Sequence, residues 1–230
     1  AVSLALACRA LGPENVYGIR MPYATSSPDS LDHAREAFEQ TGAHEQTIDI
    51  TAAVDGYLTN FEDDADGLRR GNVMARMRMI VLFDQSAKLR ALPLGTGNKS
   101  ERLLGYYTWH ADDAPPINPL GDLFKTQVWA LARHLAVPQA IVDKPASADL
   151  VRGVHDEDEL GIAYHRADPI LHWLLRGCTP AELIECGFDA REVDVVHRRL
   201  EGTHWKRELP TVALLSSTAI GEFYLRPVDY

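Results

Sequence analysis

Apolar positions recur with helical spacing along most of this chain, and short apolar runs interrupt them in its first hundred residues. The helical spacing predicts helices over residues 1–11, 28–41 and 72–87, and the chain after residue 167 reads as helical throughout. Ser27 and Gly42 bracket the second of these helices as a start signal and a stop signal. The short runs over residues 15–21, 46–50 and 90–94 predict buried strands.

The alternation of these strands with helices predicts an α/β fold. Strands separated by helices pair in parallel, so we expect a doubly wound, Rossmann-like sheet with helices on both faces and a helical C-terminal part. The 230 residues are enough for one such domain with a sizeable core. Ligands of such sheets bind beyond the carboxyl ends of the strands. The loop around Tyr23, Asp49 and the turn at Gly95 all lie at that edge.

The segment over residues 92–105, LPLGTGNKSERLLG, is the strongest candidate for a ligand site. Its small-residue turn precedes an expected helix, whose free N–H groups and positive dipole end suit a phosphate. Thr96 can donate to a phosphate or a ring nitrogen, and the carboxylate of Glu101 can bind a hard cation. The alternative is an ordinary turn in which Asn98 caps the helix and Glu101 is solvated.

Two further segments carry charged groups at expected helix starts. Asp122 is expected to cap a helix that has Lys125 in its first turn. Because the helix dipole disfavours a cation at that position, an anion bound near Lys125 is predicted. The acidic run over residues 155–159, HDEDE, is expected to lie at the surface and complement a helix dipole rather than supply paired catalytic carboxylates.

Composition and charge argue against several classes of function. The net charge of −10 argues against a broad nucleic-acid-binding surface, and no apolar run approaches the length of a membrane span. Cys8, Cys178 and Cys186 form no CxxC motif and no cluster with histidines, so neither zinc binding nor a disulfide framework is expected. Unpaired cysteines are typical of a reducing compartment, which predicts a cytoplasmic protein.

A series of motifs, taken in order, resembles that of the ammonia-dependent NAD synthetases of the adenine-nucleotide pyrophosphatase superfamily. The motifs are RGNVMARMRM, LGTGNKSE, LLGYYT, INPLGDLFKTQV, SADL, DEDELG and WKR, and they extend over nearly the whole chain. The resemblance implies a fold of the ATP-pyrophosphatase type and a ligase that makes NAD from deamido-NAD, ATP and ammonia. ATP would adenylate the nicotinate carboxylate and release pyrophosphate, and ammonia would then displace AMP.

The resemblance also implies roles for individual residues and an oligomeric state. Thr96, Lys125 and Ser147 match ATP-binding positions, Arg76 and Lys206 match deamido-NAD-binding positions, and Glu101 matches the ligand of a Mg²⁺ ion. A homodimer is implied as well, and the apolar helix around Met77 is a candidate for its interface.

The chain departs from the family pattern in several places. The family's first strand and its pyrophosphate-binding loop, Ser-Gly-Gly-x-Asp-Ser, are expected immediately before Ala1, so residues 1–230 are interpreted as a single NAD-synthetase domain without them. Trp109 and Pro116 lie where some members have a lysine and an aspartate that contact deamido-NAD, and Trp205 lies where some have histidine. The residues expected to bind the nicotinate part of deamido-NAD therefore match the family pattern less closely than the residues expected to bind ATP.

Other functions and nitrogen sources stay open at this point. The alternatives are another ligase of the ATP-pyrophosphatase type and a catalytically inactive nucleotide-binding relative. Residues 1–230 contain no glutaminase segment, so free ammonia is the predicted nitrogen source. Supply of ammonia by a separate glutaminase subunit is the alternative. No nucleic-acid or membrane partner is expected.

Overall fold

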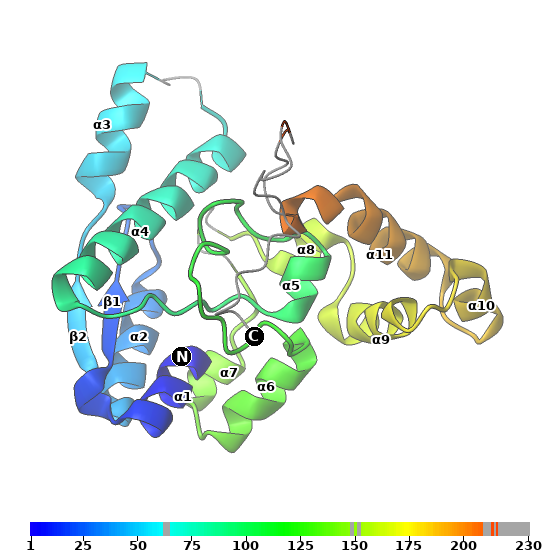
Figure 1. The fold of residues 1–230 in the computed structure, drawn as a ribbon, viewed down its shortest axis with the longest axis horizontal. Helices are drawn as coiled ribbons and strands as arrows, with labels where there is room; N and C mark the ends of the chain where they lie inside the picture. The colour runs from blue at the N-terminus through cyan, green and yellow to red at the C-terminus, as the bar shows by residue number, and fades with distance from the viewer. Residues whose placement is uncertain (62–64, 148–149, 151–152, 209–212, 214, 216–230) are drawn as a thin grey trace.

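The structure is a computed structural model, and it describes residues 1–61, 65–147, 150, 153–208, 213 and 215. It is a helix-rich α/β fold with a parallel sheet (Figure 1). The helices are α1 (Val2–Leu11), α2 (Pro28–Thr41), α3 (Thr51–Phe61), α4 (Gly67–Leu89), α5 (Lys99–Leu103), α6 (Lys125–His134), α7 (Gln139–Val142), α8 (Asp156–Leu160), α9 (Tyr164–Leu175), α10 (Pro180–Glu185) and α11 (Ala190–Gly202). The strands are β1 (Tyr17–Arg20) and β2 (His44–Thr47), and the 3₁₀ turns are η1 (Pro13–Asn15) and η2 (His204–Arg207).

β1 and β2 pair in parallel, and α2 forms the crossover between them. The predicted signals of α2 are confirmed: Ser27 Oγ accepts a hydrogen bond from Ser30 N at 3.1 Å, and Gly42 ends the helix in the left-handed conformation. β2 begins two residues earlier than the predicted run of residues 46–50. The predicted apolar end is nevertheless buried at Ile50, which is 1% exposed and donates from its N–H to Pro22 O.

The strand predicted over residues 90–94 is wrong in its extent. Within the described residues, only Leu94 of this run forms a bridge, which is parallel and pairs it with Ile117. Arg90 ends α4 with a φ of 52°, in the left-handed region, and so turns the chain before a strand can begin. Pro93 has no N–H to donate to a ladder, which limits pairing further.

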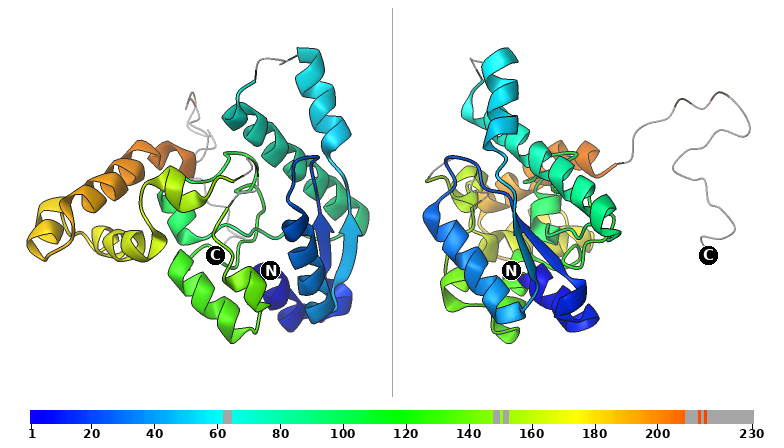
Figure 2. Two further views of the ribbon diagram at one scale, coloured as in Figure 1. Left: turned by 180° about the vertical axis from the view of Figure 1, so that it is seen from behind. Right: turned by 90° about the vertical axis from the view of Figure 1, so that its left-hand side faces the viewer.

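Buried apolar side chains form three separate clusters among the described residues. One joins α5 to α8–α11 around Tyr164, a second joins α1, α6 and α7 around Leu120, and a third joins α3 and α4 around Val54. Figure 1 shows α3 and α4 on one side, α9–α11 on the other, and α5, α6 and α8 between them. The left view in Figure 2, seen from behind, shows the same arrangement. Of the described helices, none combines the length and the apolar character needed to cross a membrane.

Candidate functional site

The turn over residues 95–98 is held in place by the segment that carries Asn118. Gly95 N donates to Ile117 O at 2.7 Å, and Asn118 Nδ2 donates to Gly97 O at 2.8 Å. The side chain of Asn118 lies directly against Gly95, where an added Cβ would be 3.1 Å from Asn118 Cβ. Thr96 is exposed at this turn. The INPLG motif therefore supports the turn that presents Thr96.

The tight contact at Gly95 leads to a stability prediction. Gly95→Ala is expected to lower the free energy of unfolding by about 1–3 kcal/mol, because the new Cβ would crowd Asn118 and Ile117 O. The matched control is Gly56→Ala in α3, where an added Cβ meets nothing within 4 Å. That control is expected to be neutral or to stabilise by about 0.5–1 kcal/mol. Urea unfolding measures both, and equal midpoints for the two variants would contradict the prediction.

α5 begins with a capping box that orients Glu101. Glu101 N donates to Asn98 Oδ1 and Asn98 N donates to Glu101 Oε2, each at 3.0 Å. The two contacts satisfy backbone donors that the first turn of a helix leaves unpaired. The cap at Asn98, which belongs to the alternative interpretation of this turn, is therefore confirmed, but the solvated Glu101 of that interpretation is not, because its side chain is 19% exposed. Because one carboxylate oxygen of Glu101 is engaged in the box, the other can face a ligand or a cation.

Lys125 faces that second oxygen. Its Nζ donates to Glu101 Oε1 at 2.8 Å and lies 4.0 Å from Asp156 Oδ2. The ammonium also lies 5.2 Å from the centre of the Tyr164 ring. The side chains of Lys125, Glu101 and Asp156 are 15%, 19% and 6% exposed, so this is a partly desolvated cluster of charges. The anions beside Lys125 in the structure are thus carboxylates of the protein.

The prediction that Asp122 caps the helix carrying Lys125 is wrong. α6 begins at Lys125 itself, and Asp122 instead forms an exposed ion pair with Lys99 at 2.7 Å. The turn at residues 120–123 separates Asp122 from the helix: Leu123 N donates to Leu120 O at 2.9 Å.

The capping carboxylate of α6 comes from α9 instead. Asp168 Oδ2 accepts from Thr126 N at 2.9 Å and from Thr126 Oγ1 at 2.7 Å. Asp168 Oδ1 accepts from Ser100 Oγ, which in turn accepts from Lys125 N at 2.8 Å. This carboxylate, 4% exposed, therefore fixes the first turns of α5 and α6 against each other. As a result, Glu101 and Lys125 are brought to one place.

Asp156 also departs from prediction, because it is not a surface residue. It is 5% exposed, and its Oδ1 has no hydrogen-bond partner among the described residues. Burial raises the pKa of Asp156, and the positive charge of Lys125 partly offsets that shift. Asp156 N donates to Ala146 O at 2.9 Å, and the adjacent Ser147 donates from Oγ to Val154 O at 2.9 Å. Ser147 thus lies on the segment that borders the Lys125 cluster.

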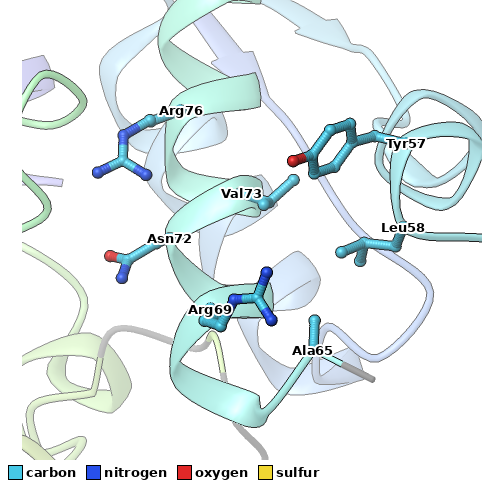
Figure 3. A pocket seen from close by; sticks show the side chains of 7 residues that line it. All are labelled: Tyr57, Leu58, Ala65, Arg69, Asn72, Val73 and Arg76. Atoms are coloured by element: carbon cyan, nitrogen blue, oxygen red, sulfur yellow. The ribbon is translucent and has the colours of Figure 1, made fainter. Parts of the chain in front are cut away.

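Arg76 lies in a second cluster, where α4 meets the loop after α5. Its Nε donates to Trp109 O at 3.3 Å, and one turn earlier Asn72 Oδ1 accepts from Thr108 Oγ1 at 2.9 Å. Both side chains also line a pocket of about 210 Å³ with residues of α3. Figure 3 shows Asn72 and Arg76 projecting from the side of α4 that faces away from Tyr57. They can therefore contact the loop, or a ligand that lies on it.

Lys206 reaches the same loop from η2. Its Nζ donates to Gly105 O at 2.8 Å and to Tyr107 O at 3.0 Å, and desolvation lowers its pKa. The neighbouring Trp205 meets Trp109 edge to face, with ring centroids 5.3 Å apart. Arg76 and Lys206 are thus brought to one loop although 130 residues of sequence separate them.

The candidate site therefore consists of a carboxylate–lysine cluster and a loop held by two cations, with α5 between them. Sequence reasoning missed three residues that build it: Asn118, Asp156 and Asp168. Among the described residues, no group of three or more histidine, cysteine or acidic side chains could hold a metal ion by itself. A single carboxylate nevertheless fits Mg²⁺, which retains water ligands and takes substrate phosphates as further ligands. In the candidate site, Glu101 is the carboxylate that the sequence predicts for this role.

Comparison with known proteins identifies the family. A sequence model of the NAD synthase family matches residues 1–210. The NH₃-dependent NAD⁺ synthetase of Trichlorobacter lovleyi is 46% identical over 216 residues, which cover 94% of this chain and 79% of that protein. Two solved structures are also similar. NMN synthetase from Francisella tularensis gives a TM-score of 0.80 at 29% identity, covering 94% of this chain and 84% of that one.

The second structure, NH₃-dependent NAD synthetase from Campylobacter jejuni in complex with nitrate, gives a TM-score of 0.76 at 27% identity. It covers 93% of this chain and 86% of its own. Both structures share the Rossmann-like architecture expected from the alternation of strands and helices. The family match and the 46% identity over most of both chains lead to one conclusion: this chain belongs to the NAD synthase family.

Proposed function

We propose that this protein is an ammonia-dependent NAD synthetase, a carbon–nitrogen ligase that amidates deamido-NAD with ammonia while ATP is cleaved to AMP and pyrophosphate. The observation that carries the proposal is the Lys125–Glu101 pair, 2.8 Å apart, beside the turn that presents Thr96. A cation, a metal-binding carboxylate and a small-residue turn before a helix are the groups that a polyphosphate needs. Another ligase of the ATP-pyrophosphatase type would need the same groups to bind ATP. The residues that bind the pyridine part of deamido-NAD must therefore distinguish this function from that of such a ligase.

On the ATP side, the residues neutralise and orient the polyphosphate. A carboxylate is a poor electrophile, and transferring AMP to it converts it into a reactive acyl-adenylate with AMP as a good leaving group. Lys125 places a positive charge where negative charge develops as the α-phosphorus is attacked. Thr96 and Ser147 supply hydroxyl donors. When bound, Mg²⁺ held by Glu101 supplies further charge neutralisation.

On the pyridine side, Arg76 and Lys206 bind deamido-NAD across the loop over residues 105–109. Each already donates to carbonyl oxygens of this loop, so a ligand lying on it meets both cations. Trp109 and Trp205 offer aromatic faces for stacking on a pyridine ring. Deamido-NAD carries two phosphates and a carboxylate, and two cations at the loop suit these anionic groups.

The test is an assay of the full-length protein with ATP, Mg²⁺, ammonium and deamido-NAD. NAD, AMP and pyrophosphate are expected to form in equal amounts. Nicotinate mononucleotide is the competing substrate to include, because one similar structure is an NMN synthetase. Glutamine in place of ammonium tests the nitrogen source, and it should support no amidation unless a separate glutaminase subunit is added. Failure to form AMP from these reactants would reject the proposal.

Replacing Arg76 tests the assignment of the two substrate sides. Arg76→Ala is expected to raise KM for deamido-NAD about tenfold, the equivalent of about 1.4 kcal/mol, and to leave KM for ATP nearly unchanged. The control is Arg35→Ala on the exposed surface of α2, where Arg35 pairs only with Asp32 and Glu39 among the ion pairs of the described residues. A rise in KM for ATP alone would show that the assignment is reversed.

We further propose that residues 1–230 act as a single NAD-synthetase domain in a cytoplasmic homodimer. α4 supports the dimer, because Leu68, Ile80 and Phe83 leave 73%, 54% and 37% of their surfaces exposed along this helix. The three free cysteines support a reducing compartment. Sedimentation equilibrium of the full-length protein tests the dimer, and a concentration-independent monomer mass would reject it.

A further inference from the structure

The guanidinium of Arg207, in η2, lies against the carboxyl-terminal ends of two helices. Nη1 donates to Leu103 O at 3.0 Å and to Arg102 O at 3.3 Å, which are carbonyls of the last turn of α5. Nη2 donates to Leu200 O, in the last turn of α11, at 2.7 Å. Helix ends leave such carbonyls unpaired and carry partial negative charge. One side chain therefore supplies both the charge and the donors that join α5 to α11.

α5 depends on contacts at its ends because it is only five residues long. A helix this short gains too few internal hydrogen bonds to hold its own conformation. At its amino end, Asp168 binds Ser100 and the capping box binds Glu101. At its carboxyl end, Arg207 binds the carbonyls. The direction in which Glu101 faces is therefore set from both ends of α5.

The same junction sets the start of the loop that Lys206 contacts. Gly105 follows α5 with a φ of 66°, and an added Cβ there would overlap the side chain of Thr203. Arg207 Nη1 also donates to Thr203 Oγ1 at 3.2 Å. Because Lys206 donates to Gly105 O, any shift of α5 relative to η2 changes the position of the loop. Through α5 and Thr203, Arg207 is thus connected to both the Lys125–Glu101 pair and the loop over residues 105–109.

We propose that Arg207 is a positioning residue for the amidation reaction. It fixes α5 between α11 and α6, so that Glu101 faces Lys125 while the loop over residues 105–109 stays in reach of Lys206. It acts through α5 and not by contact with a substrate. The inference rests on the proposed function, since it assigns Arg207 a part in that same site.

Lysine cannot replace this arginine fully. A guanidinium is a planar fork that donates to two helix ends at once, whereas an ammonium donates from a single atom. Methionine keeps much of the length and loses both charge and donors. Because misplacing a catalytic group by about 1 Å can cost roughly 100-fold in rate, Arg207→Met is expected to lower kcat about 30- to 100-fold. Arg207→Lys is expected to lower it about 3- to 10-fold.

The experiment compares full-length Arg207→Met and Arg207→Lys with Arg198→Met, a control on the same helix bundle whose arginine is 69% exposed and pairs with Asp194. For each variant, kcat, KM for ATP and for deamido-NAD, the Mg²⁺ concentration for half-maximal rate, and the melting temperature are measured. We expect lower kcat and a higher Mg²⁺ requirement in both Arg207 variants, with partial recovery in the lysine variant and normal values in the control.

A purely structural role would lower the melting temperature and leave the kinetics of the folded protein unchanged. Normal kcat and a normal Mg²⁺ requirement in either folded Arg207 variant would therefore overturn the proposal. If Arg207→Met does not fold, Arg207→Lys decides the matter on the same criterion. A wild-type protein that forms no NAD would instead overturn the proposed function, so the two failures are distinguishable.

Discussion

Replacing Glu101 with glutamine is expected to lower the rate of pyrophosphate release by about 100-fold or more. Glutamine has the same shape and can still accept from Asn98 N in the capping box, so the first turn of α5 is expected to persist. What is lost is the negative charge that pairs with Lys125 at 2.8 Å and that would bind Mg²⁺. The variant therefore separates the capping role of Glu101 from its electrostatic role.

The chain offers a matched control for this substitution. Glu182 forms the same kind of capping box with Thr179 at the start of α10, at an exposed position outside the candidate site. Glu182→Gln is expected to leave pyrophosphate release unchanged. The measurement is the initial rate of pyrophosphate release as a function of Mg²⁺ concentration. Near-normal rates for Glu101→Gln at saturating Mg²⁺ would show that Glu101 only caps its helix.

Replacing Asp168 with alanine is expected to have the largest effect on stability. The change leaves Thr126 N, Thr126 Oγ1 and Ser100 Oγ without their buried acceptor. A buried donor without a partner costs about 1–3 kcal/mol. We therefore expect the free energy of unfolding to fall by about 3 kcal/mol or more, and Tm to fall by roughly 6–12 °C.

Urea unfolding and thermal melting measure this effect. The control is Asp194→Ala, which removes an exposed ion pair with Arg198 and is expected to change stability by less than about 0.5 kcal/mol. Below its melting temperature, the Asp168 variant should also show reduced NAD formation, because Asp168 holds the first turns that carry Glu101 and Lys125. A fall of less than about 1 kcal/mol in the free energy of unfolding would mean that water or a neighbouring group accepts hydrogen bonds from the donors that have lost Asp168.

Local signals predicted many of the elements in this chain. Ser27 and Gly42 bracket α2, and Asn98 caps α5, because each signal acts within four residues of the helix end that it controls. The strand–helix alternation likewise predicts the parallel pairing of β1 with β2. Family motifs, in turn, single out Glu101, Lys125, Arg76 and Lys206 as site residues, a set of roles that remains a proposal.

The assembly of the site depends on partners that are distant in sequence. No pattern near Asp122 could reveal that α6 is capped by Asp168, which lies 42 residues after Thr126. The acidic run that contains Asp156 reads as surface until α8 packs beside Lys125 and buries its first carboxylate. A local sequence pattern thus determined where helices begin and end. Which charges face one another was decided only by the tertiary structure, because burial and hydrogen-bond partners arise when distant helices pack together.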